Sequence, residues 1–206
     1  GRLSAVNRIG EMMIATRHGD FPVRKGDKIA GTRVIPLTIS RSQMESAAAA
    51  AAGGPILRIL PFQARRAGVV TTGSEVFHGL IEDQFTPVIE QKLAEYGSIM
   101  AGHRIVDDDP VMAANAIRDM LAEGCDLILC TGGMSVDPDD RTPQAIRSVA
   151  DEVVGYGAPV LPGAMFLLGY YEDGTVVMGL PGCVMYAGAT VFDLVLPRIA
   201  AGVEVT

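Results

Sequence analysis

The sequence has little of what several classes of protein require. It contains no tryptophan and only three cysteines among its 206 residues. Cys125, Cys130 and Cys183 are odd in number and have no CxxC spacing. A disulfide framework or a zinc site built on cysteine is therefore not expected. We expect buried free thiols in a reducing, cytoplasmic compartment.

Long basic runs and long apolar runs are also missing. The chain has 17 Lys and Arg against 24 Asp and Glu, for a net charge of -7, and no basic run exceeds two residues. A nucleic-acid partner is therefore not expected. The longest weakly polar run, residues 158–171, is too short to cross a bilayer and is broken by Pro159 and Pro162. We expect no membrane partner. Any anionic ligand must be bound locally, by backbone N–H groups, helix ends or a metal ion.

Four common catalytic signatures are absent. No Gly-Lys-Ser/Thr occurs and there is no GxGxxG, which argues against a P-loop kinase and a dinucleotide dehydrogenase. The histidines are isolated and form no HExxH, so we do not expect a zinc site. Ser74 and Ser135 have no histidine partner nearby in the sequence, which disfavours a hydrolase triad.

Residues 1–65 differ in pattern from the rest of the chain. They predict a small α+β appendage with helices at 6–16 and 40–52 and strands at 21–23, 32–39 and 56–60. The chain starts at Gly1 within an amphipathic pattern, so we expect this part to be the end of a truncated upstream domain. Four groups lie close together here and form either a solvated surface or part of a ligand rim: Arg17, His18, Arg24 and Lys25.

Residues 66–206 alternate regularly between apolar strands and helical patterns. The predicted strands cover residues 68–71, 98–106, 126–130 and 175–180, with a short apolar pair at 153–154 and an apolar segment at 161–170. The predicted helices cover residues 83–96, 111–123, 143–150 and 181–196. Such alternation indicates an α/β domain with a mostly parallel sheet and helices on both faces. Its crossovers should be right-handed.

The chain between residues 127 and 143 is the first candidate for a functional surface. Four apolar residues at 127–130 suit a strand that is covered on both faces. Gly132 and Gly133 allow a sharp turn and a close approach of ligand to backbone. Three aspartates follow, and then Thr142-Pro143 marks a helix start. Ligands bind at the carboxyl ends of parallel strands. The alternative is an ordinary strand-to-helix loop whose acids are merely solvated.

Three loops that directly follow predicted strands join small or hydroxyl residues to glycine. In a parallel sheet these loops lie along one edge, where N–H and hydroxyl groups form a cradle suited to phosphate. The residues that we expect to bind ligand there are Thr71, Thr72, Gly73, Ser74, Thr131, Gly132, Gly133, Met134, Ser135, Pro181 and Gly182.

Two clusters of carboxylates accompany these loops, at residues 107–109 and at Asp137, Asp139 and Asp140. If their strands are neighbours, the clusters face each other. Acids beside a phosphate cradle suit a bridging divalent ion such as Mg²⁺. A carboxylate can also accept hydrogen bonds from the N–H edge of a heterocycle such as a pterin. For residues 107–109 the alternative is a match to a helix dipole, which we favour for two of the three.

Four motifs in this order resemble the molybdopterin-binding family, which includes the Mog- and MoaB-type adenylyltransferases, the MoeA-type molybdotransferases and gephyrin. Residues 69–75, which end in Thr71-Thr72-Gly73-Ser74-Glu75, resemble its TTGxE segment. Residues 79–83, which end in Asp83, resemble G-x-I-x-D. Residues 131–135 with Asp140 and Thr142-Pro143 resemble TGGxS/G…D-x-TP, and residues 180–182 resemble the LPG turn. The resemblance covers about residues 66–206.

The resemblance implies a three-layer α/β/α sandwich, with Glu75 and Asp83 added to the ligand-binding residues. It places Asp140 at a ligand-pocket aspartate of the Mog type and Asp108 near the second one, so we expect these two to be catalytic. The implied ligand is molybdopterin, a pterin phosphate. Mg²⁺ would be held by Asp140 with Asp137 or Asp139, and ATP would be a co-substrate. We also expect a homo-oligomer and, as partners, molybdoenzyme apoproteins.

The predicted function is molybdopterin binding in molybdenum cofactor biosynthesis or delivery, with molybdopterin adenylyl transfer or molybdate insertion as the transferase activity. The chain departs from the family after the LPG turn, where residues 183–186 (Cys-Val-Met-Tyr) replace the usual Asn/Gln-Pro. Molybdopterin binding is therefore better supported than either catalytic step. One alternative is a non-catalytic carrier or sensor of the cofactor. Another is a domain associated with nucleotide-amide hydrolysis.

Overall fold

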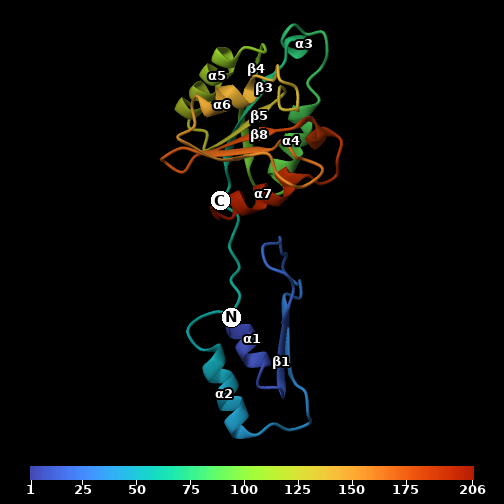
Figure 1. Cartoon of the computed structure of the whole chain (residues 1–206), viewed down its shortest axis with the longest axis vertical. Helices are drawn as coiled ribbons and strands as arrows, with labels where there is room; N and C mark the ends of the chain where they lie inside the picture. The colour runs from blue at the N-terminus through green and yellow to red at the C-terminus, as the bar shows by residue number, and fades with distance from the viewer. The chain divides into compact units, whose positions relative to one another are not determined.

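The computed structural model describes all 206 residues, which divide into two compact units, Gly1–Leu60 and Pro61–Thr206 (Figure 1). The first unit is small and holds few elements. Only Val6 and Ala47 among its hydrophobic residues are buried. In chain order, its elements are α1 (Arg2–Asn7), β1 (Met12–Thr16), β2 (Ala30–Val34) and α2 (Arg41–Ala51).

Several of the predicted elements of the first unit are wrong. The helix expected over residues 6–16 is α1 followed by β1, because Gly10 turns the chain at a φ of +93°. The side chain of Asn7 then accepts the N–H of Ile14 at 2.7 Å and donates to its carbonyl at 3.0 Å, which holds the extended strand. The strands expected at 21–23 and 56–60 are absent. The predicted helix α2 is confirmed, with Ser40 as its N-cap.

The second unit contains the regular alternation that the sequence predicts. Its elements are β3 (Arg66–Thr72), α3 (Ser74–Phe77), α4 (Phe85–Ala94), β4 (Ile99–Val106), α5 (Pro110–Ala122), β5 (Leu127–Thr131), α6 (Thr142–Arg147), β6 (Glu152–Tyr156), β7 (Leu167–Tyr170), β8 (Val176–Leu180), the 3₁₀ helix η1 (Gly182–Met185) and α7 (Val191–Ala200). Two expectations change in detail. The apolar segment 161–170 forms a strand only at its end, and the last helix divides into η1 and α7. No helix in either unit has the length and hydropathy needed to cross a membrane.

The six strands form one sheet in the order β4-β3-β5-β8-β7-β6. The first four strands of this order are parallel, whereas β7 runs antiparallel to both β8 and β6. A mostly parallel sheet is therefore confirmed. Because parallel strands carry their following loops at the same edge, this topology places the chain after β3, β4, β5 and β8 at one carboxyl edge.

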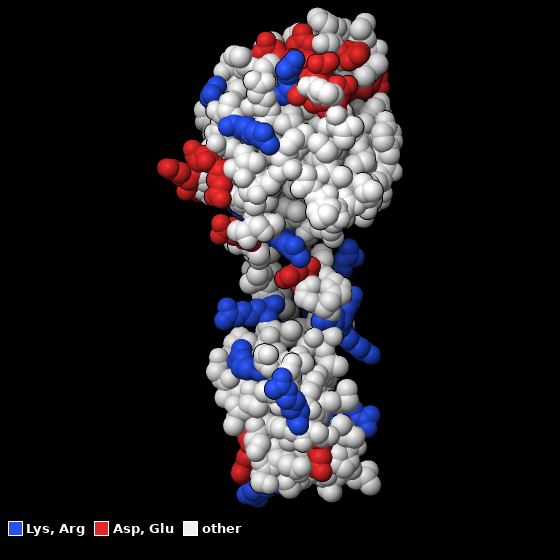
Figure 2. Space-filling model, viewed as in Figure 1, with Lys and Arg blue, Asp and Glu red and all other residues white.

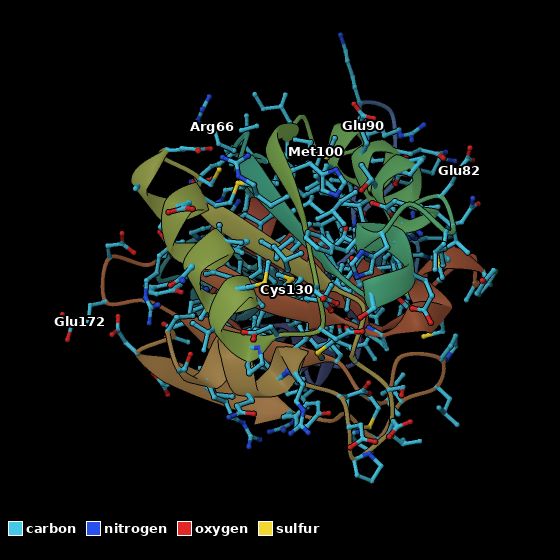
Figure 3. The ribbon with its side chains drawn as sticks, turned by 90° about the horizontal axis from the view of Figure 1, so that it is seen from above. Arg66, Glu82, Glu90, Met100, Cys130 and Glu172 are labelled. Atoms are coloured by element: carbon cyan, nitrogen blue, oxygen red, sulfur yellow. The ribbon has the colours of Figure 1, made fainter.

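Helices cover both faces of the sheet and give it two hydrophobic cores (Figure 1). On one face, Leu127 and Leu129 of β5 pack in a core with residues of α4 and α7. On the other, Ile128 and Cys130 pack in a core with residues of α5 and α6. Cys130 is fully buried near the middle of the sheet (Figure 3). The strand is apolar on both sides because both faces are covered, and the predicted three-layer α/β/α sandwich is confirmed.

Candidate functional site

The strand register brings three of the predicted turns to one edge. Thr71 of β3 pairs with Thr131 of β5, and Thr131 pairs with Leu180 of β8. On the other side of β3, Thr72 pairs with Val106 at the end of β4. The turns that follow these strands therefore begin at the same level. This edge is the candidate site.

The glycine turn after β5 requires glycine for two independent reasons. Gly132 has a φ of +79° and Gly133 a φ of +50°, which L side chains rarely adopt. A Cβ on Gly132 would also lie 1.9 Å from the carbonyl oxygen of Thr72. No protein acceptor takes a hydrogen bond from the backbone N–H of Gly132, Gly133 or Met134. The turn therefore contains three consecutive N–H groups without a protein acceptor, and two of them belong to the partly exposed residues Gly132 and Gly133.

The hydroxyl of Thr72 ties the turn to helix α6 from below. It lies 2.8 Å from the hydroxyl of Thr142 and donates to the carbonyl of Thr131 at 3.2 Å. Thr72 and Thr142 are both buried. Thr72 thus supports the turn from within the protein, rather than presenting its hydroxyl at the surface. Thr142 is the first residue of α6 rather than its N-cap, which is Arg141.

Asp140 closes the loop that follows the glycine turn. Its Oδ2 accepts hydrogen bonds from both the backbone N–H and the hydroxyl of Ser135, the latter at 2.8 Å. Its other carboxylate oxygen, Oδ1, accepts no hydrogen bond within the protein. Asp137 accepts the N–H of Asp139 at 3.0 Å, and the side chain of Asp139 is 92% exposed. Of the three acids, Asp140 is the one whose carboxylate is fixed by Ser135 and still has an oxygen, Oδ1, that can accept from a ligand.

The acidic cluster after β4 divides its work. Asp109 caps α5 by accepting the N–H groups of Val111 and Met112, at 2.7 and 3.0 Å. Asp107 and Asp108 reach across to the turn after β3, where they accept the hydroxyl and the N–H of Ser74 respectively. The hydrogen bond from Ser74 lowers the pKa of Asp107, so this carboxyl is ionised at neutral pH. We expected two of these three acids to stabilise the start of a helix. Only Asp109 does so, as the N-cap of α5.

The structure sorts the predicted ligand-binding residues into two groups. Five are buried: Thr71, Thr72, Thr131, Met134 and Pro181. The remainder are at least partly exposed: Gly73, Ser74, Glu75, Asp83, Gly132, Gly133, Ser135 and Gly182. A ligand at this edge would therefore meet mainly glycine backbone, serine and carboxylate groups.

The fit of a magnesium ion can be judged from these contacts. No group of three or more His, Cys, Asp or Glu side chains is placed to hold a metal. The exposed carboxylates of Asp137 and Asp139 do not converge with Asp140 into such a group. Mg²⁺ commonly binds through one or two carboxylates, phosphate oxygens and water. The residues fit an ion that arrives with a phosphate ligand and uses Asp140, and they do not fit a site built from protein groups alone.

One residue of the site region has no signal in the sequence. His103 lies within β4, and its Nε2 is 3.0 Å from the hydroxyl of Thr71 and 3.2 Å from Asp83 Oδ2. Its isolation from other histidines suggests no role. Only the pairing of β3 with β4, together with the position of the loop that carries Asp83, brings it to the site.

The charge of the second unit limits how it can bind an anion. Residues 61–206 carry eight Lys and Arg against twenty Asp and Glu. Acidic side chains gather around the α3 end of this unit, whereas the charged side chains visible on residues 1–60 are mostly Lys and Arg, scattered over an otherwise uncharged surface (Figure 2). No cluster of basic side chains lies in the turns of the site. Neutral N–H donors or a metal ion must therefore supply the attraction for a phosphate.

Comparison with known proteins identifies the domain that carries this edge. Residues 68–201 match the family described as "probable molybdopterin binding domain". The chain belongs to this molybdopterin-binding family. The matched residues run from β3 into the end of α7, so they include all four turns of the candidate site.

Relatives of this molybdopterin-binding domain differ in what surrounds it. The molybdenum cofactor biosynthesis bifunctional protein of Synechococcus elongatus is 31% identical over 147 residues, which are 66% of this chain and 46% of that protein. A CinA-like protein of Mycobacterium tuberculosis is 37% identical over 81 residues, which are 39% of this chain and 19% of that protein. The chain thus spans about half the length of the first relative and about a fifth of the second.

Solved structures show the same fold in domains of similar size. The molybdopterin biosynthesis enzyme MoaB from Thermus thermophilus is 28% identical, with a TM-score of 0.56, over 67% of this chain and 97% of that one. The Mog protein from Mycobacterium ulcerans is 25% identical, with a TM-score of 0.51, over 66% and 93%. Nearly the whole of each neighbour is therefore matched by about two thirds of this chain.

Proposed function

We propose that the second unit binds molybdopterin at the carboxyl edge of its sheet and acts in molybdenum cofactor biosynthesis or delivery. In this proposal the ligand's phosphate lies over the glycine turn after β5. The partly exposed Gly73 and the exposed Gly182 lie in the neighbouring turns. Asp140 and Asp108 stand on two sides of the ligand.

The observation that carries this proposal is the row of N–H groups at Gly132, Gly133 and Met134, which have no acceptor in the protein. Unpaired backbone donors are costly when they are removed from water without a partner. A phosphate satisfies several of them at once. The local excess of acidic side chains makes such neutral donors the route by which this unit can hold an anion.

For catalysis, we propose adenylyl transfer or molybdate insertion by a transferase. Mg²⁺ would be held by Asp140 and phosphate oxygens, and when bound it would neutralise charge on the phosphates. Asp140 is oriented for this by Ser135, which leaves Oδ1 open. In adenylyl transfer, an oxygen of the molybdopterin phosphate bonds to the α-phosphorus of ATP, and pyrophosphate leaves. The chain's own turns would orient the two phosphate groups for that displacement.

The binding half of the proposal is tested by isothermal titration of the purified chain with molybdopterin. Asp140→Asn removes the negative charge and replaces one of the two acceptor oxygens by an NH₂ donor, so the side chain can no longer offer one oxygen to Ser135 and a second one to a ligand. We expect its Kd to rise at least tenfold, about 1.4 kcal/mol. Asp119→Asn is the matched control, because Asp119 lies exposed on α5 and away from the edge. Wild-type affinity in Asp140→Asn would remove Asp140 from the pocket.

The catalytic half is tested by incubating the chain with molybdopterin, ATP and Mg²⁺ and measuring adenylylated molybdopterin and pyrophosphate. Formation of both supports adenylyl transfer. Tight binding of molybdopterin without AMP transfer would instead support a carrier or sensor. Titration with the adenylylated form then distinguishes a later step, such as molybdate insertion, from simple carriage.

The setting of the activity is also part of the proposal. We place the protein in the cytoplasm, as a homo-oligomer that passes its product towards molybdoenzyme apoproteins. Two buried cysteines without a disulfide fit a reducing compartment. Sedimentation of the purified chain tests the oligomer, and co-purification with an apo-molybdoenzyme tests the transfer.

A further inference from the structure

A polar network lies beneath the candidate site, on the face of the sheet covered by α4. The hydroxyl of Thr131 donates to that of Thr71 at 3.2 Å. Thr71 in turn donates to Asp83 Oδ2 at 3.2 Å. Nε2 of His103 lies 3.0 Å from the Thr71 hydroxyl, 3.2 Å from that of Thr86 and 3.2 Å from Asp83 Oδ2. The network thus connects β5, β3 and β4 to the start of α4.

The hydrogen bonds determine where the protons lie. Each threonine hydroxyl has one proton to donate. The proton of Thr71 and that of Thr86 both go to Asp83, and that of Thr131 goes to Thr71. None is left for His103. Its Nε2 must therefore carry a proton and donate it, and Nδ1 is the nitrogen without a protein partner.

Asp83 is the point on which these donors converge. Its Oδ1 accepts the N–H groups of Phe85 and Thr86 at 2.8 and 3.2 Å, and its Oδ2 accepts the two hydroxyls and His103. Burial raises the pKa of Asp83, but the hydrogen bonds from Thr86 and from the two N–H groups, and the charge of His103, outweigh it and lower that pKa. The side chain is 10% exposed, so the carboxylate is held almost entirely by the protein.

We infer that His103 is a positioning residue for the candidate site, which holds Asp83 and Thr71 in place through its Nε2–H group. Asp83 lies at the end of the loop 79–83, two residues before α4. Thr71 accepts a hydrogen bond from the hydroxyl of Thr131, the residue just before the glycine turn. The effect of His103 on ligand binding rests on the proposed function. The inference assigns Asp83 to the scaffold beneath the ligand rather than to direct contact with it.

Two substitutions of similar polarity test whether His103 acts through the hydrogen bond from Nε2 or only by filling space. In His103→Gln the side-chain amide nitrogen can take the place of Nε2 and donate to Asp83. In His103→Asn the shorter amide stands nearer the place of Nδ1 and cannot reach. The first readout is hydrogen exchange at the N–H groups of Phe85 and Thr86, which needs no ligand. The second readout is the Kd for molybdopterin, and His18→Asn in the first unit is the control.

We expect His103→Asn to speed exchange at both N–H groups about tenfold and to raise the Kd about tenfold, as the loss of a hydrogen bond to a charged group predicts. His103→Gln should restore both values to within about threefold of the wild type. Exchange that is unchanged in His103→Asn, or equally fast in both variants, would overturn the inference. If His103→Asn does not fold, Thr71→Val takes its place and must show the same faster exchange.

The readouts also separate this inference from the proposed function. A wild-type chain that does not bind molybdopterin would refute the proposed function, while the exchange rates would still decide whether His103 holds Asp83. Conversely, a Kd that is unchanged in His103→Asn despite faster exchange would refute the role of His103 in positioning the site and leave molybdopterin binding intact.

Discussion

Replacing Gly132 by alanine tests the geometry of the glycine turn most directly. At a φ of +79°, a residue with a side chain costs roughly 1–2 kcal/mol more than glycine. The new Cβ would also lie 1.9 Å from the carbonyl oxygen of Thr72, which is backbone and cannot swing aside. Forcing a methyl group into packed structure costs about 1–3 kcal/mol. We therefore expect Gly132→Ala to lower the free energy of unfolding by about 2–5 kcal/mol.

Urea denaturation followed by near-UV circular dichroism measures this loss of stability in the second unit, which contains Gly132. The chain has no tryptophan, and all five tyrosines lie at or beyond Tyr96, so the tyrosine signal reports the second unit alone. The midpoint and the slope give the free energy of unfolding in water.

Two other glycines separate the causes. Gly97 has nearly the same φ, +73°, but a Cβ there meets nothing within 4 Å. Gly97→Ala should therefore show the backbone cost alone, about 1–2 kcal/mol. Gly188 has neither a positive φ nor a neighbour, so Gly188→Ala should cost nothing. If Gly132→Ala were no more destabilising than Gly97→Ala, the close approach of Gly132 to the strand end would be refuted.

Three further predictions use other parts of the second unit. Because the pKa of Asp83 is lowered, its stabilising contribution is present above pH about 4 and lost as the pH falls through the lowered value; urea midpoints of the wild type should fall more than those of Asp83→Asn between pH 5 and 2. Burial raises the pKa of Cys130 to about 12, so a thiol reagent at pH 8 should label Cys183 in the folded chain and Cys130 only on unfolding, and early labelling of Cys130 would contradict its burial. Thr72→Val leaves the buried hydroxyl of Thr142 without its partner and should cost about 1–3 kcal/mol in unfolding free energy, and an unchanged midpoint would show that the pair contributes nothing.

The second unit could be predicted from sequence because its pattern reports a real core. The apolar run at 127–130 is buried on both faces of the sheet, and residues 176–180 (Val-Val-Met-Gly-Leu) are also buried throughout. Helix α5 begins where Asp109 and Pro110 indicate, with the aspartate as its cap. In these segments local preference and tertiary packing favour the same structure.

The first unit was harder to predict for a physical reason. The spacing of Val6, Ile9 and Met13 fits a helix, but of the three only Val6 is buried. With almost no core to pack against, hydrophobic spacing carries little information about structure. The turn at Gly10 and the hydrogen bonds of Asn7 to Ile14 decide the outcome instead.

The site was predictable in its turns and not in its contacts. Glycine and hydroxyl residues at strand ends can be found in the sequence, and the parallel sheet brings those turns together. Which groups form hydrogen bonds with each other could not be predicted, because the partners are distant in sequence. Ser74 and Asp108 are 34 residues apart, and Thr72 and Thr142 are 70 apart. His103 has no motif of its own, since its role depends on where β4 lies beside β3.

The two faces of the sheet hold the glycine turn from opposite sides. On the α6 face, Thr72 bonds to Thr142 and to the carbonyl of Thr131; on the α4 face, Thr71 bonds the Thr131 hydroxyl to Asp83. Thr131 is thus fixed through both its carbonyl and its hydroxyl, immediately before Gly132. A turn held in this way loses little conformational freedom when a ligand arrives, so more of the interaction energy appears as affinity. Loosening either face should therefore weaken ligand binding without removing a single group that touches the ligand.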